Sequence, residues 1–218
     1  MNITNILKFE GFIFDMDGVI VDNYLFHIEA WGKFCEKYGL KYSKEDFAAR
    51  YFGKTNADIL QGLFQKEMSK SEIKNLGEEK EAIYRKIYEP SIKPLPGLKP
   101  FLTRLKEEDK KIAVASSAPQ SNIDFVVKHT GIKQYIDVMV NGDMVTKGKP
   151  NPDIFLMASS MLGIEPHKCV VFEDSFSGIQ AALNAGMHVV AVATTHKINE
   201  HDKKLEIIKD FNSFKKTS

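Results

Sequence analysis

The chain has few of the features that mark secreted, membrane-spanning or disulfide-rich proteins. It contains two cysteines, Cys35 and Cys169, which stand far apart and outside any CxxC pattern. Such a pair makes neither a disulfide framework nor a zinc motif, which fits a reducing compartment. No apolar run approaches the ~20 residues that a membrane span requires. The opening residues MNITNILKFEG also lack the apolar stretch of a signal peptide. We therefore expect a cytoplasmic protein.

An excess of charge of one sign is also missing. The chain has 30 basic and 29 acidic residues, which leaves a formal net charge of +1. A nucleic-acid-binding surface would need a basic patch or stripe, and we expect neither a nucleic-acid nor a membrane partner. The motifs HExxH, GxGxxG and GxSxG are absent, which argues against the metalloproteases, dinucleotide-binding enzymes and serine hydrolases that carry them. An acidic ligand would have to be bound by local groups rather than by an overall positive field.

The sequence does contain short apolar runs separated by helical patterns. The runs lie at 12–14, 112–115, 138–140, 169–172 and 189–193. Runs of this kind, rich in β-branched residues and without alternation, are typical of strands buried on both faces of a parallel sheet. Gly131, Gly163 and Gly186 stand just past helical patterns, where glycine can close a helix. The alternation predicts an α/β fold with a doubly wound, mostly parallel, Rossmann-like sheet.

One region breaks this alternation. From Asn23 to about Tyr88 only amphipathic helical patterns occur, and a proline-rich stretch around Gly97 follows before the sheet resumes. We therefore predict two domains. Residues 1–22 and 91–218 form an α/β core, and residues 23–90 form an inserted, all-helical domain.

Polar clusters lie at or beyond the ends of four of the expected strands. They are Asp15 with Asp17, Ser116 with Ser117, Lys149, and the Glu173–Asp174 pair. Ligands of open α/β sheets bind outside the carboxyl ends of the strands. We therefore expect these groups to converge at one edge of the sheet. Alone, each acidic or serine cluster could be turn or helix-capping chemistry, and Lys149 could be a solvated loop lysine, but their joint occurrence in this order favours a site.

Several carboxylates around one point are tolerable only with a cation among them. Oxygen ligands with few or no histidines favour Mg²⁺, which binds through one or two carboxylates, waters and a phosphate. Ser116 and Lys149 offer a hydroxyl donor and a compact cation to phosphate oxygens. A carboxylate nucleophile, a metal and phosphate ligands are the parts for phosphoryl transfer through an aspartyl-phosphate intermediate.

Four segments carry these groups in order: DMDGVIVD, VASS, GKPNPD and VVFEDSFSGIQAALNAG. In these segments, over nearly its whole length, the chain resembles the haloacid dehalogenase-like superfamily. More closely it is similar to the β-phosphoglucomutase-like phosphatases, which carry a helical cap between the first two motifs. The resemblance implies that Asp15 is the nucleophile and that Asp17 is the general acid and then the base. It also implies that Asp15, the Asp17 carbonyl and Asp174 hold Mg²⁺, with Glu173 as a nearby ligand or supporting carboxylate.

Further roles follow from the same resemblance. Ser116, Lys149 and backbone N–H groups near Ser117 would hold the phosphoryl oxygens. The helical insert would be a mobile lid over the leaving group, with hinges near Asp22–Asn23 and Ser91–Pro96. The family default is a monomer whose partner is a small phosphorylated metabolite.

Substrate choice would then depend on the cap. His27 and Trp31 match positions that face the active site in the mutases, although simple packing explains His27 as readily and is the favoured explanation for Trp31. Lys54 lies in the segment that matches the family's specificity loop. The chain departs from the mutases at Asn56, where they place an arginine that grips a second phosphate, and a lysine lacks the bidentate fork of that arginine. Asn23 replaces the usual threonine or serine and can cap the following helix.

These observations lead to one interpretation and two alternatives. The interpretation is a Mg²⁺-dependent phosphomonoester hydrolase that acts on a small phosphorylated metabolite, by resemblance a sugar phosphate. The first alternative is a β-phosphoglucomutase-type isomerase primed by a sugar bisphosphate, which Asn56 opposes. The second is a non-catalytic phosphate-binding regulatory protein, which the intact set of acidic motif residues opposes.

Overall fold

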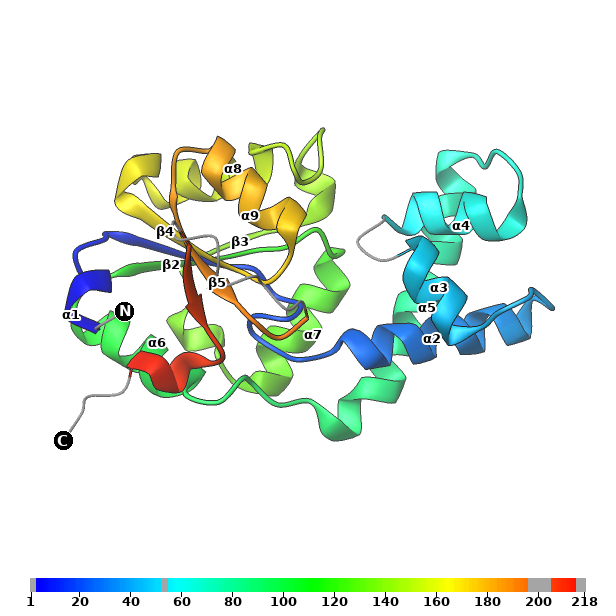
Figure 1. Ribbon diagram of the computed structural model, residues 1–218, viewed down its shortest axis with the longest axis horizontal. Coiled ribbons are helices and arrows are strands. Elements are labelled where there is room, and N and C mark those ends of the chain that lie inside the picture. Colours follow the sequence, from blue (N-terminus) through cyan, green and yellow to red (C-terminus); the bar gives the residue numbers. More distant parts are fainter. Residues whose placement is uncertain (1–2, 52–54, 196–204, 215–218) are drawn as a thin grey trace. The chain divides into compact units, whose positions relative to one another are not determined.

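The computed structural model describes residues 3–51, 55–195 and 205–214 (Figure 1). The chain divides into two compact units, an α/β unit built from residues 1–22 and 92–218 and a helical unit built from residues 23–91. Within the described ranges, no helix has the length and apolar character needed to cross a bilayer.

The α/β unit contains a parallel sheet of six strands in the order β3–β2–β1–β4–β5–β6. The strands are β1 (Gly11–Phe14), β2 (Lys111–Ala115), β3 (Val138–Val140), β4 (Cys169–Glu173), β5 (His188–Val192) and β6 (Glu206–Ile208). The predicted doubly wound parallel sheet is confirmed, and the apolar runs in the sequence form β1 to β5. The sequence does not predict β6, because its three residues, EII, include a charged residue and leave only two apolar ones in a row.

Helices cover both faces of this sheet. They are α1 (Ile3–Ile6), α6 (Leu98–Glu107), α7 (Gln120–Thr130), α8 (Asp153–Leu162) and α9 (Phe176–Asn184). Short 3₁₀ helices also belong to this unit: η2 (Lys133–Tyr135), η3 (Gly142–Met144), η4 (Pro166–Lys168) and η5 (Phe211–Phe214). Gly131 and Gly163 close α7 and α8 in the left-handed conformation, as their positions in the sequence predict.

The central strand β1 is buried on both faces. Phe14 stacks on Phe172 of β4 with ring centroids 4.6 Å apart, and Phe101 of α6 packs edge-on against both rings. Ile13 points to the opposite face, where it joins the apolar cluster formed with α8 and α9, and Figure 1 shows these two helices on one side of the sheet. Successive strand side chains alternate between faces, so both layers anchor β1 and β4.

The helical unit consists of α2 (Tyr24–Lys37), α3 (Lys44–Tyr51), α4 (Asn56–Phe64), α5 (Lys70–Tyr88) and η1 (Glu89–Ser91). Two of these helices begin with capping boxes, in which Thr55 pairs with Asp58 and Ser69 pairs with Glu72. Each box satisfies backbone N–H groups that the first helical turn leaves without partners. An aromatic and aliphatic cluster that includes Trp31 and Phe34 forms the core of this unit.

Asn23 precedes α2, but its side chain makes no capping hydrogen bond. Its amide donates instead to the hydroxyl of Tyr84 on α5 over 2.6 Å, and the residue is 1% exposed. The capping role expected from the residue type is therefore wrong. The buried Tyr84 hydroxyl needs a partner, and the bond that it makes with Asn23 links the start of α2 to α5.

Candidate active site

The strand order places the ends of β1 and β4 side by side at the point where the sheet changes winding direction. Such topological switch points are where open α/β sheets bind ligands. The register pairs Phe14 with Phe172, so the next residue of each strand, Asp15 and Glu173, emerges at the same level. The Asp15 N–H donates to the Phe172 carbonyl over 3.0 Å, which extends the strand pairing into the site.

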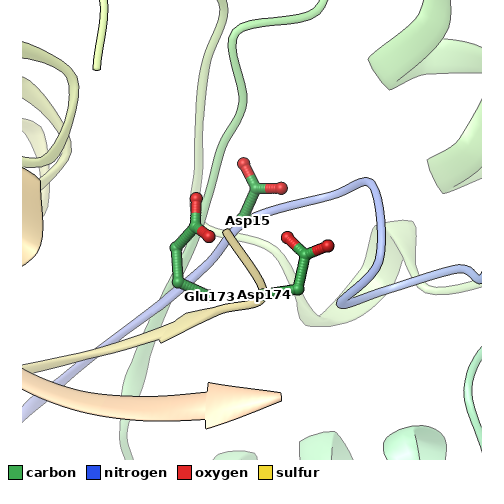
Figure 2. Close-up of side chains that lie close together, drawn as sticks. All are labelled: Asp15, Glu173 and Asp174. Carbon is green, nitrogen blue, oxygen red and sulfur yellow. The ribbon is translucent and has the colours of Figure 1, made fainter. Parts of the chain in front are cut away.

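Asp15, Glu173 and Asp174 form a carboxylate cluster at this edge. One oxygen atom of each lies within 4.8 Å of an oxygen of the other two, and Figure 2 shows the three carboxyl groups pointing to the same side. All three residues are buried, with exposed fractions of 5%, 1% and 6%. Like charges this close and this dry repel strongly.

The repulsion appears in the ionisation of two of these acids. Burial raises the pKa of Asp174 to about 7, and the neighbouring Glu173 adds to the shift. Burial also raises the pKa of Asp15 well above its usual value. Lys149 opposes that shift, while Glu173, Asp174 and Asp17 increase it. The positive charge that the protein supplies here is therefore too small to keep all three acids as easily ionised as they are in water.

Lys149 supplies the positive charge closest to the cluster. Its Nζ lies 2.7 Å from Asp15 Oδ1 and 2.6 Å from Glu173 Oε1, and its side chain is 9% exposed. Burial would lower the pKa of Lys149, but these two carboxylates outweigh burial and raise the pKa above its usual value. The lysine therefore stays charged, and its single ammonium group is the nearest positive charge to three carboxylates.

Glu173 is held in place by the start of α9. Its Oε2 accepts hydrogen bonds from the N–H of Ser175 over 2.7 Å and from the Ser175 hydroxyl over 3.0 Å. The side chain lies so close to Gly178 that a Cβ there would meet Glu173 Oε1 at 1.7 Å. With Lys149 on its other oxygen, both carboxylate oxygens of Glu173 have partners within the protein.

The loop after β1 wraps closely around Asp174. Gly18 has a φ of +77°, and a Cβ at this position would lie 2.0 Å from Asp174 Oδ2, so both the backbone conformation and the space require glycine. The Thr194 hydroxyl donates to the Gly18 carbonyl over 2.5 Å. The Thr195 hydroxyl is hydrogen-bonded to Asp174, which opposes the burial-driven rise in the pKa of that acid.

The two threonines belong to the site but were missed by the sequence analysis. They follow β5 just as the other polar groups follow their strands, so the rule that located the other clusters also applies to them. Threonine is a common loop residue, whereas closely spaced acids are not. Only their position after a buried apolar run therefore marks these two threonines as candidates.

The remaining predicted groups of the α/β unit lie next to this cluster. Asp17 is half-buried, and its charge is close enough to raise the pKa of both Asp15 and Asp174. Ser116 and Ser117 follow β2, whose Val114 pairs with Phe14 of β1. Ser116 is buried, and its Oγ accepts a hydrogen bond from the Ala118 N–H over 3.1 Å.

The predicted cap residues belong to the helical unit. The His27 ring stacks on Tyr84 with centroids 3.9 Å apart. Trp31 is 3% exposed and packs against Phe34, which favours the packing role for this residue. Asn56 begins α4 and donates to Glu81 over 2.8 Å. Lys54 lies outside the described residues.

The carboxylate cluster suits a hard cation. Its donors are all oxygen atoms, they are buried, and two of them have raised pKa values because counter-charge is short. Mg²⁺ prefers carboxylate and water oxygens over nitrogen or sulfur ligands. On charge and donor chemistry, Asp15 and Asp174 therefore fit a magnesium ion.

Comparisons with known proteins agree with this fold. Residues 12–192 match the model of the haloacid dehalogenase-like hydrolase family. The chain is 34% identical over 197 residues to the phosphorylated carbohydrates phosphatase of Thermotoga maritima, and this alignment covers 90% of each chain. It is 33% identical over 188 residues to the β-phosphoglucomutase of Bacillus subtilis, and this alignment covers 83% of this chain and 81% of the relative.

A solved structure gives the same result. The crystal structure of a family IA, variant 3 hydrolase from Entamoeba histolytica is 29% identical in sequence, with a TM-score of 0.86. The match covers 94% of this chain and 95% of that one. The family match spans most of the sequence and includes both Asp15 and Asp174. The protein therefore belongs to the haloacid dehalogenase-like hydrolase family.

Proposed function

We propose that the protein is a Mg²⁺-dependent phosphomonoester hydrolase that acts on a small phosphorylated metabolite, a sugar phosphate by the names of its relatives. The observation that carries this proposal is the buried cluster of Asp15, Glu173 and Asp174 with Lys149 at the end of the central strands. The similarity to the Thermotoga maritima phosphatase supports the substrate class.

In the first step, a carboxylate oxygen of Asp15 attacks phosphorus in line with the leaving oxygen. A bond forms between Asp15 and phosphorus, and the bond from phosphorus to the leaving oxygen breaks. The carboxyl group of Asp17 gives its proton to that oxygen, so the product leaves as a neutral alcohol. Asp15 then carries the phosphoryl group as an aspartyl phosphate.

The second step reverses the role of Asp17. Its carboxylate takes a proton from a water molecule, and the water oxygen attacks phosphorus. The bond between phosphorus and Asp15 breaks, which releases inorganic phosphate and restores the Asp15 carboxylate. Because Asp17 is half-buried rather than sealed in the cluster, it can meet both the leaving group and water.

Other groups bind rather than react. Lys149, the Ser116 hydroxyl and the backbone N–H of Ser117 would hold phosphoryl oxygens. Asp15, Asp174 and the main-chain carbonyl of Asp17 would hold Mg²⁺, with Glu173 beside them. Bound Mg²⁺ supplies positive charge that offsets the carboxylates and the phosphoryl oxygens.

The helical unit would act as the lid and select the leaving group. In this proposal His27, Lys54 and Asn56 provide its polar contacts, and Trp31 supports them from the core of the unit. The connecting segments at Asp22–Asn23 and Ser91–Pro96 would be the hinges. Closure of such a lid excludes water from the first step.

A β-phosphoglucomutase-type isomerase is the second candidate. The similarity to the Bacillus subtilis enzyme favours it. Asn56 opposes it, because an amide cannot replace the bidentate, charged grip of the arginine that the mutases place there.

A panel of sugar phosphates tests both candidates. We expect the purified protein with Mg²⁺ to release inorganic phosphate from at least one sugar monophosphate, and EDTA to abolish the release. A mutase would instead convert β-glucose 1-phosphate into glucose 6-phosphate only when primed with glucose 1,6-bisphosphate, without net phosphate release. The absence of both activities across the panel would contradict the proposed function.

A further inference from the structure

The helical unit contains a buried ionic cluster that the proposed chemistry does not use. Lys80 and Glu81 are consecutive residues of α5 and are only 2% and 3% exposed. Lys80 Nζ lies 2.9 Å from Glu81 Oε1. Charged side chains are almost never this buried unless they are paired, and placing both in one helix core calls for an explanation.

The pair contacts two of the residues proposed to bind the leaving group. Lys80 Nζ lies 2.9 Å from His27 Nδ1. Because an ammonium group can only donate, Nδ1 of a neutral His27 accepts this bond, while Nε2 lies 3.5 Å from the amide nitrogen of Asn23. Glu81 Oε1 accepts a second hydrogen bond, from the amide of Asn56 over 2.8 Å. The four side chains therefore form one network.

The charges within this network balance. Burial would raise the pKa of Glu81, but the neighbouring charge of Lys80 leads the effects that outweigh burial and lower the pKa to about 2. Glu81 thus stays ionised at neutral pH and neutralises the charge of Lys80. A second phosphate brought near Asn56 would meet the carboxylate of Glu81 rather than a net positive charge, and like charges in a buried site repel strongly.

We propose that Glu81 is a specificity-determining residue that keeps the network neutral, so that the network accepts the hydroxyl groups of an uncharged leaving group and rejects a second phosphate. The inference rests on the proposed hydrolase function and narrows its substrate class to monophosphate esters of polyhydroxylated, otherwise uncharged alcohols. A hydroxyl both donates and accepts, which matches the amide of Asn56 and the imidazole of His27. Rejection through a misplaced like charge is a common route to specificity.

The wild-type protein provides the first test. We compare kcat/KM for glucose 6-phosphate with glucose 1,6-bisphosphate, and for fructose 1-phosphate with fructose 1,6-bisphosphate. We expect the monophosphate of each hydrolysed pair to be preferred by at least about tenfold, because a like-charge contact opposes the bisphosphate. Equal or better hydrolysis of the bisphosphates would overturn the inference, even if no variant folds.

The Glu81→Gln variant provides the second test. It keeps the shape of the side chain and leaves the charge of Lys80 uncompensated, so the preference for the monophosphate should fall about tenfold. Adding Lys80→Gln to this variant should return the preference towards that of the wild type. Glu79→Gln is the matched control, because Glu79 lies on the same helix and pairs with Lys37 at the surface. It should leave the preference unchanged.

These measurements separate the inference from the function on which it rests. If the wild-type protein hydrolyses none of the sugar phosphates, the proposed function fails. If it hydrolyses monophosphates while a folded Glu81→Gln variant keeps the wild-type preference, the hydrolase proposal stands and the role of Glu81 is wrong. Circular dichroism spectra of each variant identify those that fold.

Discussion

The two units of this protein each bury an ionic cluster, and the clusters differ in how their charge is balanced. In the α/β unit, Lys149 serves three carboxylates, and the pKa of Asp174 is raised to about 7 by burial and by Glu173. In the helical unit, Lys80 faces Glu81, whose pKa is lowered to about 2 against the effect of burial. Burial acts in the same direction on both acids, so the supply of counter-charge decides the outcome.

This difference separates a cluster that is short of positive charge from one in which the two charges are paired. Carboxylates left short of positive charge cost stability, and strongly perturbed ionisation of this kind is frequent at active sites. A paired lysine and glutamate with additional hydrogen bonds need no outside ion. This contrast in counter-charge agrees with the two proposals made above, in which the α/β unit binds a cation and the helical unit recognises an uncharged group.

Replacing Lys149 should produce the largest change among the variants that probe this contrast. Lys149→Met removes the ammonium group next to Asp15 and Glu173, so metal-free protein should lose about 3–5 kcal/mol of unfolding free energy. We expect kcat/KM to fall by about 10²–10³, because a charged group that we propose to bind the phosphoryl oxygens is lost. Urea unfolding in EDTA and phosphate release measure the two effects.

The exposed neighbour Lys147 offers the control for this variant. Lys147→Met should behave like the wild type in both assays. Equal stability and activity of the two variants would mean that the ion pairs of Lys149 with Asp15 and Glu173 carry little weight.

Acid should weaken the helical cluster by a smaller amount. The pKa of Glu81 is lowered from 4.5 to about 2 in the folded protein. Its contribution is therefore fully present above pH 4.5 and is lost as pH falls towards 2. The stability difference between the wild type and Glu81→Gln should shrink by about 3 kcal/mol over this range, since one pKa unit corresponds to about 1.4 kcal/mol.

The cluster of the α/β unit should respond to pH in the opposite direction. Because the pKa of Asp174 is raised from 3.8 to about 7, metal-free protein loses the corresponding stabilisation as pH rises from about 4 to 7. Chemical unfolding in EDTA at several pH values measures both trends. A pH-independent difference between the wild type and Glu81→Gln would refute the account of the helical pair.

The smallest effect should come from Thr195. Thr195→Val removes the hydroxyl that bonds to Asp174, and loss of a group that orients a metal ligand typically weakens metal binding about 10-fold. Thr195→Ser keeps a hydroxyl and should bind Mg²⁺ nearly as the wild type does. Calorimetric Mg²⁺ titration compares the three proteins, and identical affinities would show that Thr195 does not position Asp174.

The sequence predicts the α/β cluster because its cause is local. Short apolar runs form buried parallel strands, and polar residues directly after such strands must gather at one sheet edge, so Asp15 and Glu173 could be placed together. The same rule applies to Thr194 and Thr195, which follow β5. They were not predicted, because threonine is an ordinary loop residue.

The helical cluster could not be predicted in this way. Lys80 and Glu81 stand in the densely charged stretch SEIKNLGEEKEAIYRK, where charged residues are expected to face solvent. Their burial depends on how α2 and α4 pack on α5, which brings His27 and Asn56 to them. Local pattern carries no information about that tertiary arrangement.

Phosphate release by the wild type and by Asp15→Asn, assayed together with Mg²⁺ and the same sugar monophosphate, tests the central claim most directly. If Asp15 is the nucleophile at the carboxylate cluster, the variant should keep its far-UV circular dichroism spectrum and lose on the order of 10⁴-fold or more in kcat. A folded Asp15→Asn variant with turnover within about tenfold of the wild type would contradict it.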